Sequence, residues 1–242
     1  MVVAEVRSLW KYFNSVPAIK GISFEIEKGE ILGVLGANGA GKSTLIYCML
    51  GVCSFEKGEI IFFNNLKMPK DRKKILERIN FASTYTSLPY SLTVYESLLV
   101  FGNLYRVKRI KEKIEMVLDM FSIKDLKNTP LRKLSSGQLM RVNLAKSMLN
   151  DPEILLLDEP TAGLDPEIAE KTRNMLKKRC KEIGLSILYT SHNLNEIEDI
   201  ADKILILKKG EIVAYDKKDQ LIRKYGVLNL KELYFKVASD ES

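Results

Sequence analysis

One nine-residue stretch, Gly36 to Thr44, has the residue types and spacing needed to bind phosphate. It fits the pattern G-x-x-x-x-G-K-[ST] at every fixed position. Glycines let successive backbone N–H groups turn toward phosphate oxygens, the Lys42 ammonium can reach terminal phosphates, and the Ser43 hydroxyl can ligand Mg²⁺. A glycine-rich turn that binds nothing is the alternative. The full match favours phosphate binding. The other residues of the loop expected to contact the nucleotide are Asn38, Gly39, Ala40, Gly41 and Thr44.

A pair of carboxylates, Asp158 and Glu159, follows the apolar run Ile154 to Leu157. Such a continuous run is typical of a buried parallel strand, and ligands of open α/β sheets bind at the carboxyl ends of their strands. We therefore expect Asp158 to hold Mg²⁺ through water, and Glu159 to orient or deprotonate an attacking water. The alternative is two surface acids before the turn at Pro160.

Strands and helices that would position these groups alternate along the chain. Alternating residues predict strands at Val2–Leu9 and Ile22–Glu27, with a turn at Lys11–Ser15. Three Lys-Gly-Glu triplets, whose glycines are Gly29, Gly58 and Gly210, are interpreted as hairpin turns. Further strands are expected at Ile31–Leu35, Ile79–Tyr85, Ile154–Leu157, Leu185–Tyr189 and Lys203–Leu207, and helices fill most of 93–149, 166–181 and 193–200. This order predicts a mostly parallel sheet.

Composition narrows the class of protein. The 242 residues, 46% hydrophobic and 29% charged, suit one α/β domain without an apolar run long enough to span a membrane. The net charge is +7, and the lysines are spread along the chain. This spread favours lysines that lie on solvent-exposed faces and attract anionic lipid weakly, and it argues against a nucleic-acid-binding surface. Three cysteines without metal-ligand spacing predict reduced thiols in the cytoplasm, and the alternating first ten residues predict a strand, not a signal peptide.

The segment Leu134-Ser135-Ser136-Gly137-Gln138 resembles the signature L-S-G-G-Q of the nucleotide-binding domain of ATP-binding cassette (ABC) transporters, with Ser136 in place of its first glycine. It precedes Asp158, as the order of motifs in that family requires. Residues 162–165 resemble the D-loop, which places Asp165 in it. His192, the only histidine, matches the switch histidine after the next strand. The resemblance extends over almost the whole chain.

The resemblance also implies roles for residues that spacing alone does not assign. Tyr12 matches the aromatic residue that stacks on adenine, and Val16 would pack on the same ring. Lys42, Glu159 and His192 would be catalytic, with Glu159 as the base. Thr84 stands near the position of the family's Q-loop glutamine, which touches Mg²⁺, so Thr84 is an additional candidate metal ligand.

The fold implied is an α/β P-loop NTPase core with a mostly parallel sheet, an N-terminal antiparallel β subdomain and an inserted α-helical subdomain. All of 1–242 would form a single ABC ATPase domain. The core and its antiparallel subdomain would take residues 1–84 and 150–215, the helical subdomain 85–149, and a C-terminal helical tail 216–242. Residues 229–235 look like the C-terminal helix of cassettes that serve ABC-2-type exporters.

The function implied is that of an ATP-binding subunit that hydrolyses ATP with Mg²⁺ in a head-to-tail dimer. Ser135, Ser136, Gly137 and Gln138 would face the ATP of the opposite subunit. Transmembrane permease subunits would bind the region from Thr84 to Tyr105, which places the protein at the cytoplasmic face of the membrane, and transport would be export. The alternative is a soluble ABC ATPase without a permease, such as an iron–sulfur assembly type.

Overall fold

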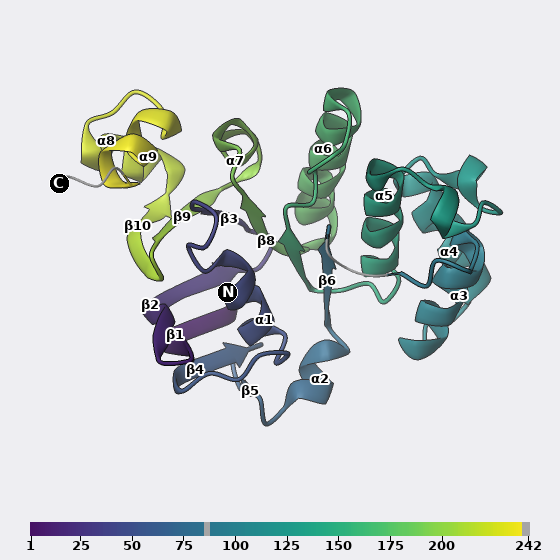
Figure 1. The fold of residues 1–242 in the computed structure, drawn as a ribbon, viewed down its shortest axis with the longest axis horizontal. Helices are drawn as coiled ribbons and strands as arrows, with labels where there is room; N and C mark the ends of the chain where they lie inside the picture. The colour runs from purple at the N-terminus through teal and green to yellow at the C-terminus, as the bar shows by residue number, and fades with distance from the viewer. Residues whose placement is uncertain (85–87, 239–242) are drawn as a thin grey trace.

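Two sheets stacked around a shared core make up the centre of the protein in this computed structural model, which describes residues 1–84 and 88–238 (Figure 1). The first sheet has the order β2-β1-β4-β5 and is antiparallel throughout. Its strands are β1 (Val2–Phe13), β2 (Val16–Glu27), β4 (Lys57–Phe62) and β5 (Leu66–Met68).

The second sheet has the order β10-β9-β3-β8-β7-β6 and is parallel except at its edge strand β10. It consists of β3 (Ile31–Leu35), β6 (Ile79–Ser83), β7 (Ile154–Asp158), β8 (Ser186–Ser191), β9 (Lys203–Lys208) and β10 (Glu211–Lys217). Every residue of β3, β7 and β8 is buried, which explains why apolar residues follow one another in these strands without alternation, as in Ile154–Leu157 of β7.

Helices cover both faces of the second sheet. Helix α1 (Lys42–Met49) lies against the first sheet and packs Ile46 and Met49 with Leu32 and Leu156. The opposite face carries α6 (Pro166–Ile183) and α7 (Leu194–Ile200). The remaining helices are α2 (Arg72–Leu76), α3 (Val94–Leu104), α4 (Ile110–Met120), α5 (Ser136–Ser147), α8 (Lys218–Tyr225) and α9 (Leu230–Ala238).

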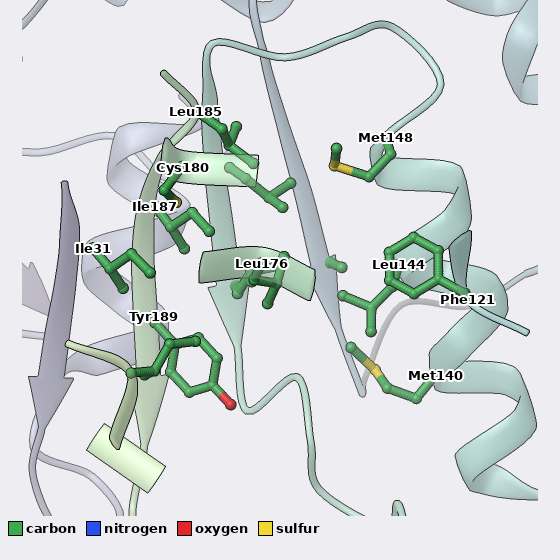
Figure 2. Packing of buried hydrophobic residues seen from close by; sticks show 14 of the residues in the cluster. Ile31, Phe121, Met140, Leu144, Met148, Leu176, Cys180, Leu185, Ile187 and Tyr189 are labelled. Atoms are coloured by element: carbon green, nitrogen blue, oxygen red, sulfur yellow. The ribbon is translucent and has the colours of Figure 1, made fainter. Parts of the chain in front are cut away.

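Helices α3, α4 and α5 gather beyond the β6 edge of the sheet (Figure 1). Figure 2 shows how α5 joins the core: Met140 and Leu144 extend from it toward the sheet, on the side of Leu176 from α6. All three side chains belong to one continuous hydrophobic cluster. The helical part is therefore packed onto the sheet through apolar contacts as well as joined to it by the chain.

This architecture confirms the predicted fold class of a mostly parallel sheet, an N-terminal antiparallel sheet and inserted helices. No helix in the described ranges is long and apolar enough to cross a membrane. Tyr85, where we expected the strand now seen as β6 to end and the helical insertion to begin, lies outside the described residues, as do the last four residues of the expected tail.

Local predictions were less accurate than the fold. The turn expected at Lys11–Ser15 is confined to Asn14 and Ser15, because β1 continues through Phe13. Of the three glycine triplets, the one at Gly210 (φ +84°) forms the tight hairpin between β9 and β10. Gly58 (φ +98°) lies inside β4, opposite an irregularity in β1, and Gly29 joins the two sheets.

Candidate active site

The loop from Gly36 to Gly41 connects the buried strand β3 to helix α1, in the strand–loop–helix order that phosphate binding requires. Gly41, immediately before the helix, has φ +112°, a conformation that other L residues rarely adopt. The Ala40 N–H donates to the Ala37 carbonyl oxygen at 3.1 Å, which closes a turn in the loop. Residues 37–39 are exposed.

The end of β9 and the β9–β10 hairpin contact this loop on the side away from the cavity. A Cβ atom added to Gly36 would lie 2.6 Å from the Leu207 carbonyl oxygen at the end of β9. The Gly210 N–H donates to the Ala40 carbonyl oxygen at 3.0 Å, so the β9–β10 hairpin is hydrogen-bonded to the loop. These contacts fix the course of the backbone on the side away from the cavity.

Lys42 directs its ammonium into the loop. Its Nζ donates to the carbonyl oxygen of Gly36 at 2.7 Å and to that of Ala37 at 3.3 Å, and the residue is only 7% exposed. Burial lowers the pKa of Lys42, and the nearby carboxylates of Glu159 and Asp158 partly offset that effect. A buried cation at this position can attract phosphate strongly, because little water screens it.

Ser43 and Asp158 form the oxygen-rich part of the site. The Ser43 hydroxyl donates to Asp158 Oδ2 at 2.7 Å, and the Thr190 hydroxyl donates to Oδ1 at the same distance. Hydroxyl and carboxylate oxygens suit Mg²⁺, which keeps several waters and takes few protein ligands. The described residues hold no cluster of three His, Cys, Asp or Glu side chains suited to a metal, so a Mg²⁺ site here would depend on Ser43, Asp158 and phosphate.

Glu159 and His192 meet at the rim of the same cavity. His192 Nδ1 lies 2.8 Å from Glu159 Oε2, and the two residues follow the neighbouring strands β7 and β8. Glu159 has φ +53°, and its N–H is shared between the carbonyl and hydroxyl oxygens of Thr190 at 3.2 Å each. A carboxylate contacting an imidazole can accept a proton from water while the histidine stabilises nearby charge.

These groups line one cavity of about 460 Å³. It brings together most of the residues predicted from the sequence, from the phosphate loop, from β7 and from the loop after β8. Those residues are Asn38, Gly39, Ala40, Gly41, Lys42, Ser43, Thr44, Thr84, Asp158, Glu159 and His192. Thr84 is exposed and follows β6, whose Ser83 is paired with Asp158 in the sheet.

The aromatic residue at the cavity is Phe13, which corrects the assignment of Tyr12. Because β1 runs through Phe13, the ring of Tyr12 turns to the other side and stacks on Trp10, with centroids 6.0 Å apart. Phe13 and Ala18 line the cavity in the places expected for Tyr12 and Val16, and Val16 is 66% exposed at the hairpin. Lys11 Nζ lies 5.0 Å from the Phe13 ring centroid.

The signature residues lie apart from this cavity. Ser135 caps α5: its hydroxyl accepts from the Gln138 N–H at 3.2 Å, and Gln138 Oε1 accepts from the Ser135 N–H. Ser135 and Ser136 are exposed, and Ser136 lines a separate cavity of about 210 Å³ that also includes Thr84.

The D-loop lies beside the signature. A Cβ added to Gly137 would lie 2.7 Å from the Gly163 carbonyl oxygen, so the two loops are in close contact. Asp165 is exposed at the start of α6.

Sequence reasoning missed Thr190, whose hydroxyl holds Asp158, along with Phe13 and Ala18 at the cavity. Ala162, which was expected only in the D-loop, also lines the cavity. Thr190 carried a usable signal. It stands near the carboxyl end of a buried strand, two residues before His192, where parallel neighbours converge.

Comparisons with known proteins agree with this geometry. The sequence profile described as ABC transporter matches residues 19–162. Nod factor export ATP-binding protein I of Rhizobium meliloti (strain 1021) is 34% identical over 239 residues, which cover 96% of this chain and 70% of that protein. Spermidine/putrescine import ATP-binding protein PotA of Clostridium novyi (strain NT) is 31% identical over 212 residues, covering 87% and 60%.

Two solved structures resemble this one. The ATP binding subunit of an ABC transporter superposes with a TM-score of 0.88 at 24% identity, covering 97% of this chain and 99% of that one, which shows a shared fold. A dimeric ATP-binding cassette in a post-hydrolysis state, bound to ADP and Pi, superposes with a TM-score of 0.80 at 26% identity, covering 88% and 98%.

Proposed function

The chain belongs to the ABC transporter family, and on that premise we propose that it is the ATP-hydrolysing subunit of a membrane exporter. The single observation that carries the hydrolytic part is the 2.8 Å contact between Glu159 and His192 at the cavity lined by the phosphate loop. A cassette that only binds ATP would not need this pair.

ATP would lie with its phosphates on the loop before α1 and its base on the Phe13 ring. The backbone N–H groups and the positive end of the helix dipole face the phosphates. Lys42 would exchange its contacts with the loop carbonyls for phosphate oxygens, which form stronger, charge-assisted hydrogen bonds. An aromatic ring stacks on the face of a base and makes little contact with the polar groups at its edge, so discrimination between ATP and GTP should be weak.

Hydrolysis would proceed by attack of water on the γ-phosphorus. Glu159 orients that water and takes its proton, the bond from the γ-phosphorus to the β-phosphate oxygen breaks, and ADP leaves, while His192 Nδ1 donates to the Glu159 carboxylate and keeps it in place. Ser43 and Asp158 would hold Mg²⁺, which when bound neutralises charge on the phosphate oxygens. Lys42 supplies further positive charge from the protein.

We further propose that two copies act head to tail. Ser135 and the N-terminus of α5 are exposed and lie apart from the chain's own phosphate cavity, so they are free to face the γ-phosphate held by a partner. The dimeric cassette among the structural relatives supports this arrangement. Asp165 would lie at the same interface, because the D-loop contacts the signature at Gly137.

The membrane partner would bind the region from Thr84 to Tyr105 at the cytoplasmic face of the membrane. Exposed apolar side chains on α3, Val100 and Leu104, support this assignment. Export is the favoured direction, because the relative named for export covers 96% of this chain and the relative named for import 87%.

Two measurements test the proposal. Purified protein should release phosphate from Mg²⁺–ATP, and Glu159→Gln should stop that release without loss of ATP binding. Affinity capture from membranes should recover a protein with several apolar spans. Capture of a soluble scaffold in its place would favour a permease-free ABC ATPase, and phosphate release by Glu159→Gln at the wild-type rate would refute the assignment of the base.

A further inference from the structure

One carboxylate, that of Glu196 on α7, accepts hydrogen bonds from both loops that carry the proposed catalytic pair. The Thr161 hydroxyl, two residues after Glu159, donates to Glu196 Oε2 at 2.7 Å. The Ser191 hydroxyl, immediately before His192, donates to the same oxygen at 3.0 Å. The loops follow the adjacent strands β7 and β8, and hydrogen bonds to Glu196 join them.

Both hydroxyl groups are themselves held in place. The Tyr189 hydroxyl lies 3.0 Å from Thr161 Oγ1 and donates to Glu196 Oε2 at 3.5 Å. Burial raises the pKa of Tyr189, so the phenol keeps its proton. Ser191 Oγ also accepts from the Asn193 N–H at 3.0 Å. Hydrogen bonds therefore fix the backbone on both sides of His192, and all three hydroxyl-bearing residues are buried.

The positive charge of Arg173 offsets the cost of partly burying the Glu196 carboxylate. Arg173 Nη1 lies 4.0 Å from Glu196 Oε1, and the two side chains are 15% and 16% exposed. The same guanidinium donates through Nε to Asp199 Oδ2 at 2.9 Å. Glu196 therefore has one oxygen toward the hydroxyl groups and the other toward a cation, which defines a single orientation of its carboxylate.

We propose that Glu196 is a positioning residue, which keeps Glu159 and His192 within hydrogen-bond distance of each other. Glu159 sits in the left-handed region of φ and His192 on an exposed loop, so neither is fixed by regular secondary structure. Reacting groups displaced by about 1 Å can lose on the order of 10²-fold in rate. The kinetic part of this inference rests on the proposed ATPase function, whereas the geometric part does not.

The geometric part can be measured without nucleotide, because His192 is the only histidine in the protein. Its ring protons give one isolated set of NMR signals. Glu159→Gln should displace these signals in the wild-type background, since the pair is in contact. In the Glu196→Ala background, the same change should displace them by less than about half as much. An equal displacement in both backgrounds, or none in the wild type, overturns the proposal.

Ser191→Ala and Thr161→Val provide a second route if Glu196→Ala does not fold. Each removes one of the hydroxyl groups that donate to Glu196 and leaves its charge. Each should weaken the effect of Glu159→Gln on the His192 signals in the same direction as Glu196→Ala. Full retention of the effect in both variants counts against the proposal.

Kinetics separate positioning from general destabilisation. Glu196→Ala should lower kcat by about 10- to 100-fold with KM for ATP within about twofold, and Glu196→Gln, which keeps an acceptor oxygen, should stay within about threefold of wild type. Asp199→Ala is the matched control, because it removes another Arg173 partner from the same helix. Equal losses of kcat in Asp199→Ala and Glu196→Ala overturn the proposal. If wild-type protein hydrolyses no ATP, the proposed function fails, and the NMR measurement still decides the role of Glu196.

Discussion

The ammonium of Lys42 lies 2.7 Å from the carbonyl oxygen of Gly36, inside the loop whose phosphate ligand it is expected to bind. The contact places the cation before any phosphate arrives, and burial lowers its pKa while two carboxylates work against that shift. A phosphate oxygen, being charged, is a better acceptor than a carbonyl. Binding therefore needs only a change of hydrogen-bond partner at Lys42.

Replacing this lysine should remove most phosphate affinity. We expect Lys42→Ala to weaken ATP binding by at least about tenfold and to abolish phosphate release, because the buried cation facing the phosphates is lost. Equilibrium titration with ATP and a phosphate-release assay measure the two effects. Lys20→Ala is a control, since Lys20 pairs with Glu211 outside the cavity. Wild-type turnover in Lys42→Ala would show that the loop is not the phosphate site.

Phe13, and not Tyr12, should determine affinity for the base. Loss of base–aromatic stacking costs about 1–3 kcal/mol, so Phe13→Ala should weaken ATP and GTP by a similar factor of at least about five. Tyr12→Ala is the matched control, because it removes the stack on Trp10 and leaves the cavity wall intact. Titration of both variants with both nucleotides gives the answer. A larger loss in Tyr12→Ala would restore the original assignment.

Glu159→Gln should separate binding from chemistry. The amide is nearly isosteric with the carboxylate but cannot take a proton from water, so hydrolysis should fall by on the order of 10²–10⁴ while ATP still binds. Because a negative charge beside the γ-phosphate is removed, the variant should dimerise with ATP and remain monomeric with ADP. Light scattering with each nucleotide measures this.

Adding Ser135→Arg to Glu159→Gln tests whether the signature acts across the interface. The bulky side chain replaces the cap of α5 and should prevent the ATP-dependent dimer while leaving nucleotide affinity within about threefold. Dimerisation that does not depend on ATP, or that survives Ser135→Arg, would refute the head-to-tail arrangement.

Thr84 stands near the position at which the resemblance places a glutamine, and we expect its contribution to be small because its side chain is shorter. Although it lines the cavity, Thr84→Ala should lower the rate by no more than about threefold, which is under about 1 kcal/mol on the barrier. Thr84→Gln should be tolerated. Steady-state phosphate release measures both. A loss above about tenfold in Thr84→Ala would show that its hydroxyl is a metal ligand.

Lys146, on α5, should make stability depend on pH. It is 5% exposed with its Nζ 5.4 Å from the Phe101 ring centroid, and burial lowers its pKa from 10.5 to about 8. Between these values the unfolded chain binds more protons than the folded one, so stability rises with pH across that window, by on the order of 1–3 kcal/mol. Lys146→Met should remove this rise and stabilise the protein at pH 7.

Urea unfolding of both proteins from pH 7 to about 10.5 measures the effect as a difference between them. The difference between the two proteins is needed because the buried thiols have the opposite effect on stability. Burial raises the pKa of Cys48 and Cys180 to about 12. These thiols therefore lower stability once the pH rises above their pKa in the unfolded chain. Parallel pH profiles for wild type and Lys146→Met would exclude a buried charged lysine.

The residues that could be predicted from sequence are those whose partners are close in the chain. The phosphate loop is contiguous, so its spacing alone gave Lys42 and Ser43, and the buried strand before Asp158 was visible as an apolar run. Tyr12 was assigned by motif position alone. The register of β1 shifts between Leu9 and Trp10 and again after Lys11, so alternation along the strand cannot be counted reliably from the sequence.

Contacts between distant segments could not be predicted in this way. Thr190 binds a carboxylate 32 residues earlier, and Glu196 joins hydroxyl groups 35 and 5 residues away. These residues come together only because β7 and β8 are parallel neighbours in the sheet. No local sequence pattern specifies which polar side chains then contact each other near the strand ends. Likewise, the same Lys-Gly-Glu triplet takes three structural roles, since neighbouring strands decide whether the chain reverses.

The contacts behind the phosphate loop have a consequence for nucleotide exchange. Gly36 lies against the Leu207 carbonyl and Ala40 is hydrogen-bonded to Gly210, so the loop backbone is held by contacts that involve no nucleotide. Replacement of ADP by ATP then requires no refolding of the loop and little ordering entropy. In the proposed head-to-tail dimer, product release and entry of fresh ATP would then depend on separation of the two copies over the cavity, and not on rearrangement of the loop.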